Sequence, residues 1–114
     1  MILFLAIQAC YFFVTGVWPL VHIKSFVAIT GPKQDVWLVK TVGLLVFAIS
    51  VAMIVALYED SVPTPVMALA FTASVSLFFI DIYYVAINRI SPVYLFDAAV
   101  EIVFFIGWFV FLFL

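Results

Sequence analysis

Residues 42–57, VGLLVFAISVAMIVAL, decide the fold, because this run is apolar on every face of a helix. A strand of a transmembrane barrel would instead alternate apolar and polar residues in pieces of about ten. A helix that spans a bilayer needs about 20 mostly apolar residues, and the run reaches that length when it is extended back to Trp37. The stretch therefore predicts a membrane-spanning helix over residues 37–57.

The rest of the chain has the same character. Of its 114 residues, 70% are hydrophobic, 19% are aromatic and only 9% are charged, which is far from the composition of soluble domains. Four apolar stretches account for nearly all of it, at residues 2–22, 37–57, 64–87 and 93–114. The sequence therefore predicts an all-α, polytopic membrane protein, an antiparallel bundle of four transmembrane helices that forms a single domain over residues 1–114, with no soluble domain.

Turn and capping residues separate the four stretches. Residues 30–32, Thr-Gly-Pro, are typical of a turn. Thr64 before Pro65, and Ser91 before Pro92, are typical of an N-cap followed by the first residue of a helix. The residues between the stretches are therefore expected to be links.

Basic residues occur in only two of the three links. The first link and its flanks hold Lys24, Lys33 and Lys40, the third link holds Arg89, and the second holds only acidic charges. Since cytoplasmic loops carry the excess of Lys and Arg, both termini are expected outside and the two basic links in the cytoplasm. The predicted location is a cell membrane, of the bacterial inner-membrane kind, with the lipid bilayer around a multi-pass chain.

Three acidic residues fall inside the predicted spans. A helical rise of about 1.5 Å per residue places Asp81 roughly 9 Å from the inner end of the third span, and Asp97 and Glu101 roughly 6 and 12 Å from that of the fourth. The three are therefore expected in one layer. Asp81, Tyr84 and Asn88 form a stripe on one helix, as Asp97 and Glu101 do on the next. Ionisable groups inside a membrane are candidate functional residues.

Lys40, Arg89 and His22 complete the candidate ligand- or ion-binding residues. Lys40 and Arg89 are expected to pair with the carboxylates, either as a purely structural network or as part of a functional site. His22 ends the first span as an interfacial side chain. No second His or Cys is near it in the sequence, so no metal site and no cofactor are expected.

Small residues inside the spans are predicted to mark close contacts between helices. Glycine occurs once in each of three spans, without a GxxxG pair, and the hydroxyls can bond back to their own backbone. These residues are Gly16, Gly43, Gly107, Ser50, Thr72, Ser74 and Ser76.

The segment Trp18-Pro19-Leu20, followed by residues 30–43, TGPKQDVWLVKTVG, resembles small uncharacterised four-span bacterial integral membrane proteins. The resemblance covers the first two spans best and implies a four-span fold with no assigned activity. A further resemblance, to DoxX-like four-helix membrane proteins, rests on the number of spans and on the glycines of the first two.

Three classes of function follow from these residues. The first is a helix-packing accessory subunit, or a hydrophobic-ligand or lipid-binding protein, of a larger membrane assembly, with 14 phenylalanines to face lipid or other subunits. The second is a compact proton- or cation-coupled transporter or channel that uses the intramembrane carboxylates and is completed by a homo-oligomer. The third is a membrane-embedded enzyme for a lipidic substrate, with Asp97 or Glu101 as acid or base beside His22.

The sequence favours the first class. No set of nucleophile, base and orienting group is visible, so an enzyme is the less expected outcome. Nucleic acid is not expected as a partner, because the net charge is −2 and no basic patch lies outside the predicted membrane layer.

Overall fold

The computed structural model describes residues 1–31 and 35–114, and these residues form five α-helices and no strand. Four of the five are long and apolar enough to cross a membrane. They begin and end within one residue of the predicted spans, which confirms the all-α fold with four candidate transmembrane helices. The predicted turn at Pro32 and the charge of Lys33 lie outside the described residues. The helices are α1 (Ile2–Val21), α2 (Ile23–Thr30), α3 (Val36–Ala56), α4 (Thr64–Ala86) and α5 (Tyr94–Phe113).

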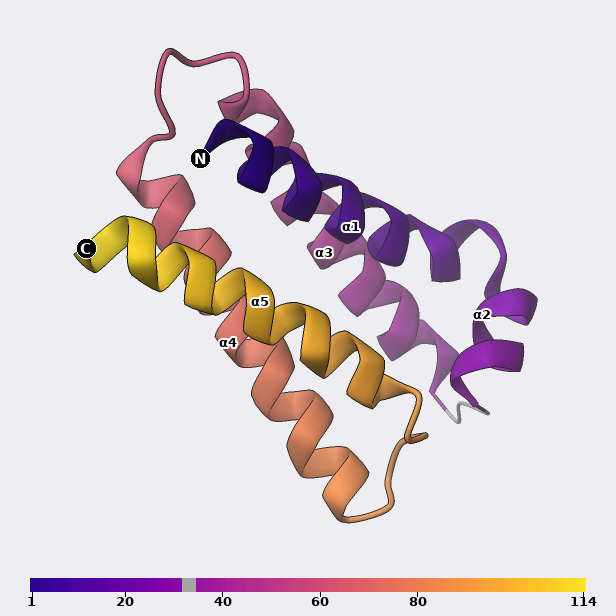
Figure 1. The fold of residues 1–114 in the computed structure, drawn as a ribbon. Coiled ribbons are helices and arrows are strands. Elements are labelled where there is room, and N and C mark those ends of the chain that lie inside the picture. The colour runs from indigo at the N-terminus through magenta and orange to yellow at the C-terminus, as the bar shows by residue number, and fades with distance from the viewer. Residues whose placement is uncertain (32–34) are drawn as a thin grey trace. The chain divides into compact units, whose positions relative to one another are not determined.

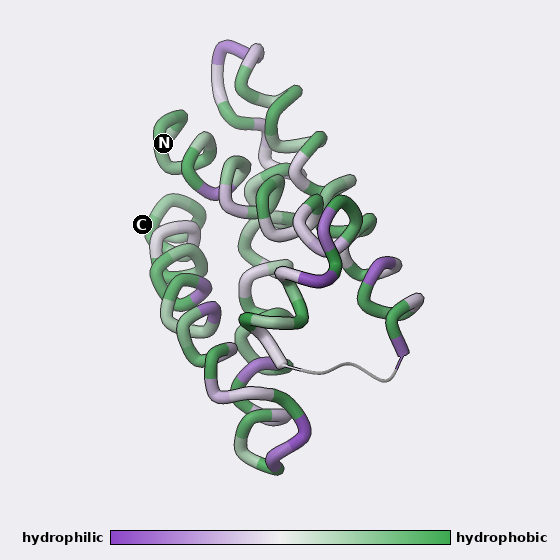
Figure 2. The backbone as a smooth tube through the Cα atoms, turned by 90° about the vertical axis from the view of Figure 1, so that its right-hand side faces the viewer, coloured by the Kyte–Doolittle hydropathy of each residue, from purple (hydrophilic) through white to green (hydrophobic). Residues whose placement is uncertain are grey.

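The chain divides into two compact units, Met1–Pro63 and Thr64–Leu114. In the first unit α1 packs against α3, and in the second α4 packs against α5. Each pair is an antiparallel hairpin (Figure 1). Figure 2 shows hydrophobic residues along the long helices and hydrophilic ones gathered mainly near their ends and links. The single domain over residues 1–114 stays a prediction.

The first link contains a short helix, α2, that the sequence does not predict. The helical backbone is interrupted at His22, with φ −143° and ψ 72°, and the His22 Nδ1 atom accepts a hydrogen bond of 3.2 Å from the Ser25 N–H. The indole N–H of Trp18 donates to Ser25 Oγ at 2.8 Å, and the ring of Trp18 meets that of Phe26 edge to face at 5.3 Å. These contacts hold α2 against the end of α1. An eight-residue helix is too short to span a membrane, so it lacks the long apolar run by which the other helices are predicted.

The α1–α3 hairpin is closest at Gly16 and Gly43. A Cβ atom added to Gly16 would lie 2.7 Å from the carbonyl oxygen of Gly43 and 2.7 Å from the backbone nitrogen of Phe47. A Cβ on Gly43 would lie 2.7 Å from the carbonyl oxygen of Gly16 and 3.0 Å from Cγ of Pro19. The backbones of the two helices therefore touch here, which confirms the predicted close contact for these two glycines.

Backbone hydrogen bonds end α4, and a turn at Ser91 precedes α5. The Tyr84 carbonyl accepts a hydrogen bond of 2.8 Å from the Arg89 N–H, and this turn needs Asn88 in the left-handed region, with φ 60°. Asparagine tolerates that conformation better than most residues. Ser91 Oγ then accepts from the Val93 N–H at 3.3 Å. The helix α5 begins only at Tyr94, with Val93 as its N-cap and no side-chain cap hydrogen bond, so the predicted N-cap at Ser91 is wrong.

Three of the small hydroxyls bond back to their own helix, as the sequence predicts. Ser50 Oγ donates to the Phe47 carbonyl at 2.6 Å, Thr72 Oγ1 to the Ala68 carbonyl at 2.8 Å, and Ser76 Oγ to the Thr72 carbonyl at 2.8 Å. Their polar groups are thereby satisfied within apolar helices.

Candidate functional site

Three acidic side chains lie together in the α4–α5 hairpin. Asp81 is five residues before the end of α4, and Asp97 and Glu101 are one turn apart near the start of α5. Because the helices are antiparallel, these two ends are neighbours (Figure 1). The Asp97 carboxyl interacts electrostatically with both Asp81 and Glu101, and we call the three groups the carboxyl cluster. The structure thus places together the three acids that the sequence places in one layer.

Glu101 is the deepest member of the carboxyl cluster. Its side chain is 0% exposed, and neither of its oxygens has a hydrogen-bond partner among the described residues. Asp81 is 4% exposed, and its Oδ2 atom is also buried without a partner in that part of the chain. Asp97 is half-buried. A buried carboxylate without a hydrogen bond is strongly unfavourable, so the cluster needs a proton or another positive charge.

One basic residue belongs to the same hairpin as the carboxyl cluster. Arg89 is the only Lys or Arg between Thr64 and Leu114, and its side chain is exposed. Its pairing with Asp81 and Glu101 stays a prediction, because Asp81 Oδ2 and both Glu101 oxygens are buried without a hydrogen-bond partner among the described residues. Lys40 is exposed on α3, in the other unit, and its pairing with the carboxyls stays a prediction.

Ser74 is a residue of this site whose role the sequence does not reveal. It is predicted as a packing residue, but it is 0% exposed and its hydroxyl acts electrostatically on the Glu101 carboxyl, although the two groups do not meet the geometry of a hydrogen bond. Ser74 precedes Asp81 by seven residues, or about two helical turns, so the two share one face of α4. That spacing is the signal in the sequence that connects Ser74 with the carboxyls.

Three of the remaining candidates are exposed rather than buried. Tyr84 and Asn88 are exposed, and the Tyr84 ring meets that of Tyr83 edge to face at 5.0 Å. His22 is exposed in the other unit, where its Nδ1 atom caps α2. Among the described residues, no group of three or more His, Cys, Asp or Glu side chains has an arrangement that could hold a metal ion.

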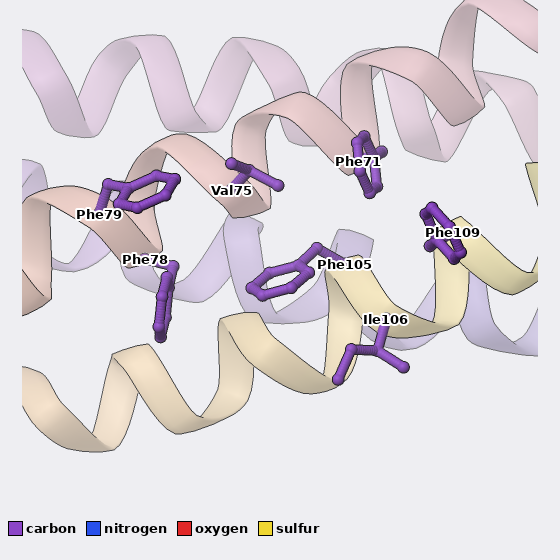
Figure 3. A pocket seen from close by; sticks show the side chains of 7 residues that line it. All are labelled: Phe71, Val75, Phe78, Phe79, Phe105, Ile106 and Phe109. Carbon is purple, nitrogen blue, oxygen red and sulfur yellow. The ribbon is translucent and has the colours of Figure 1, made fainter.

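An apolar groove of about 330 Å³ lies along the same hairpin (Figure 3). The rings of Phe78 and Phe105, from opposite helices, meet edge to face at 5.4 Å, and those of Phe71 and Phe109 are 6.5 Å apart. We call it the phenylalanine groove. It is lined by Phe71, Val75, Phe78 and Phe79 of α4 and by Phe105, Ile106 and Phe109 of α5.

Comparison with known proteins adds no family to this description. No family model matches the chain, and neither the curated proteins nor the solved structures contain a match to it. The resemblances to small four-span bacterial proteins and to DoxX-like proteins therefore gain no support. The helices define the class: this is a small helical membrane protein with four span-like helices.

Proposed function

We propose that this protein is a compact proton-coupled membrane protein, a transporter or channel in which the carboxyl cluster takes up and releases protons. The observation that carries the proposal is Glu101, a completely buried carboxyl whose two oxygens have no hydrogen-bond partner among the described residues. Buried ionisable groups in span-like helices are held at a free-energy cost, and they commonly mark ion or proton pathways.

Electrostatics favours a proton as the exchanged species. Two like charges about 4 Å apart repel by about 4 kcal/mol at an effective dielectric constant of about 20, and the cluster gathers three carboxyls. One bound proton removes a charge and also supplies a hydrogen-bond donor to a neighbouring carboxyl. The proton would then be shared within the cluster rather than held by one residue. An inorganic cation is a weaker candidate, because no metal-holding arrangement exists among the described residues.

The distribution of basic residues gives the proposal an orientation. If the two basic links face the cytoplasm, the carboxyl cluster lies in the cytoplasmic half of a cell membrane and both termini lie outside. Protons would then reach the cluster from the cytoplasm. A second copy of the chain or another membrane subunit would complete a path to the far side.

Carbodiimide labelling tests whether the cluster carries exchangeable protons. N,N′-dicyclohexylcarbodiimide reacts with protonated carboxyls in apolar surroundings and leaves an adduct that peptide mass spectrometry can locate. With the whole protein in lipid nanodiscs, we expect labelling at Glu101 or Asp81 that declines as the pH rises. Glu59 and Asp60, which are exposed in the link between α3 and α4, should stay unlabelled.

Matched variants connect this labelling with function. Glu101→Gln should abolish labelling at position 101 and slow proton flux into liposomes that contain an entrapped pH dye. Glu59→Gln makes the same change at an exposed carboxyl and should behave as the unmodified protein. Absence of labelling in the cluster at every pH, with flux equal in both variants, would refute proton coupling.

A second candidate function is the accessory, hydrophobic-ligand or lipid-binding role, and the phenylalanine groove favours it. Native mass spectrometry from a mild detergent tests this role, because a retained lipid or subunit would add its mass to that of the chain. An enzyme with His22 as partner of Asp97 or Glu101 gains no such support, because Nδ1 of His22 is engaged in the cap of α2.

A further inference from the structure

The phenylalanine groove is large enough for a small molecule, and all of its lining side chains are apolar. Its volume of about 330 Å³ lies at the lower end of the range of about 300 to 1,000 Å³ that is usual for ligand pockets. Figure 3 shows rings from both helices around it, with Phe78 of α4 and Phe105 of α5 next to each other. Every lining residue belongs to α4 or α5, so the groove is a property of this hairpin alone.

The groove begins within one helical turn of the carboxyl cluster. Phe105 follows Glu101 by four residues on α5, and Phe78 precedes Asp81 by three residues on α4. Residues at these spacings are neighbours on one side of a helix. An occupant of the groove beside Phe78 and Phe105 is therefore one turn from the buried carboxyls on both helices.

The phenylalanine groove and the carboxyl cluster together favour an occupant with a positive charge. The faces of aromatic rings attract cations, and the attraction is stronger where water is excluded. The carboxyl cluster needs positive charge, and the only basic side chain of the hairpin, Arg89, is exposed. A neutral acyl chain could fill the groove, but only a cation could take the place of a proton of the carboxyl cluster.

We propose that the α4–α5 hairpin binds a lipophilic organic cation, with its apolar body in the phenylalanine groove and its charge beside the carboxyl cluster. This inference rests on the proposed proton-coupled function and names its substrate class. The exchange is balanced in charge: one monovalent cation binds and one proton leaves a carboxyl of the cluster for water. Cation and proton would thus compete for Glu101 and its neighbours, as antiport requires.

Isothermal titration calorimetry of the whole protein in detergent tests the proposal with tetraphenylphosphonium as the probe. Titrations in two buffers of different ionisation enthalpy at one pH count the protons released. We expect saturable binding with release of about one proton for each cation, and weaker binding as the pH falls. Triphenylphosphine oxide, a neutral molecule with the same kind of rings, should bind more weakly.

Three variants separate the groove from the charge. Phe105→Ala should weaken binding of the probe about tenfold, the size expected for loss of one desolvated cation–π contact. Phe96→Ala removes a ring of α5 that is 71% exposed and outside the groove, and it should bind as the unmodified protein does. Glu101→Gln should remove or halve the proton release. Thermal unfolding of each variant shows whether the hairpin remains folded.

The outcomes distinguish this inference from the function on which it rests. Carbodiimide labelling of the cluster without any binding of tetraphenylphosphonium would overturn the organic cation and leave proton exchange standing. Binding that releases no proton and is unchanged in Glu101→Gln would also overturn it. Loss of both labelling and binding would overturn both proposals. Equal affinity for the neutral phosphine oxide would overturn the cation and assign the groove to uncharged apolar ligands.

Discussion

Gly16→Ala should open the α1–α3 hairpin and destabilise it, although the substitution adds only one methyl group. The new Cβ atom would lie 2.7 Å from the carbonyl oxygen of Gly43, 2.7 Å from the backbone nitrogen of Phe47 and 3.1 Å from its Cα. All three atoms belong to the backbone of α3, so no side chain can rotate away. Ordinary contacts begin at about 3.4 Å, and the helices must therefore separate by several tenths of an ångström.

The expected magnitude is a balance of two terms. Overpacking of this kind costs about 1–3 kcal/mol, while replacing glycine by alanine inside a helix returns up to about 1 kcal/mol. We therefore expect a net loss of about 1–2 kcal/mol in the free energy of unfolding for Gly16→Ala. Gly43→Ala should cost less, because one of its close contacts, at 3.0 Å, is with the ring of Pro19 rather than with backbone.

Reversible unfolding in mixed micelles, followed by circular dichroism, measures these differences. Val42→Ala is the matched control, since it places alanine next to Gly43 at a position that is 53% exposed. It should change stability little. If Gly16→Ala is as stable as Val42→Ala, the backbone contact between α1 and α3 does not hold the hairpin together, and the reasoning fails.

Three further predictions follow from other contacts. His22→Ala should cost about 1 kcal/mol in the local stability of α2, because Nδ1 of His22 caps it, whereas His22→Asn should keep the cap; hydrogen exchange of the α2 amides distinguishes them. Asn88→Gly should be tolerated, because glycine readily adopts φ 60°. Asn88→Val should lower the free energy of unfolding by at least about 1 kcal/mol, and thermal unfolding followed by circular dichroism measures the difference. Glu101→Met should raise the thermal midpoint and add about 1 kcal/mol or more to the free energy of unfolding, because it removes a buried carboxyl without a hydrogen-bond partner. Glu59→Met, at an exposed position, should not raise either quantity.

The long helices could be predicted because their signal is local. An apolar run such as residues 42–57 has only one favourable conformation in a bilayer, and the link at Ser91 contains a hydrogen bond between neighbours in the sequence, from the Val93 N–H to Ser91 Oγ. The helix α2 could not, since its start depends on His22, a residue type that is not among the usual N-caps.

The candidate site was only partly predictable, for a different reason. Helical rise alone puts Asp81 and Glu101 at similar depths, so their shared layer can be computed from the sequence. Which basic residue neutralises Asp81 and Glu101 depends on where the long Lys and Arg side chains point. Arg89 has a flexible stem that can reach inward or outward, and the structure leaves it exposed. The spacing of Ser74 and Asp81 predicts that they share a face of α4, but it does not predict which side chain of the facing helix lies next to Ser74.

The position of the acids within their hairpin bears on how the chain enters a membrane. Residues 64–80 and 102–114 carry no charged side chain, whereas the three carboxyls lie near the closed end of the hairpin. In the proposed orientation this closed end stays on the side where ribosomes deliver the chain. The segments that must cross the bilayer are then wholly uncharged. The acidic residues reach their buried positions by moving only a short distance into the bilayer from the cytoplasmic side. Assembly would thus install a proton-binding site without ever carrying a carboxylate through the hydrocarbon core.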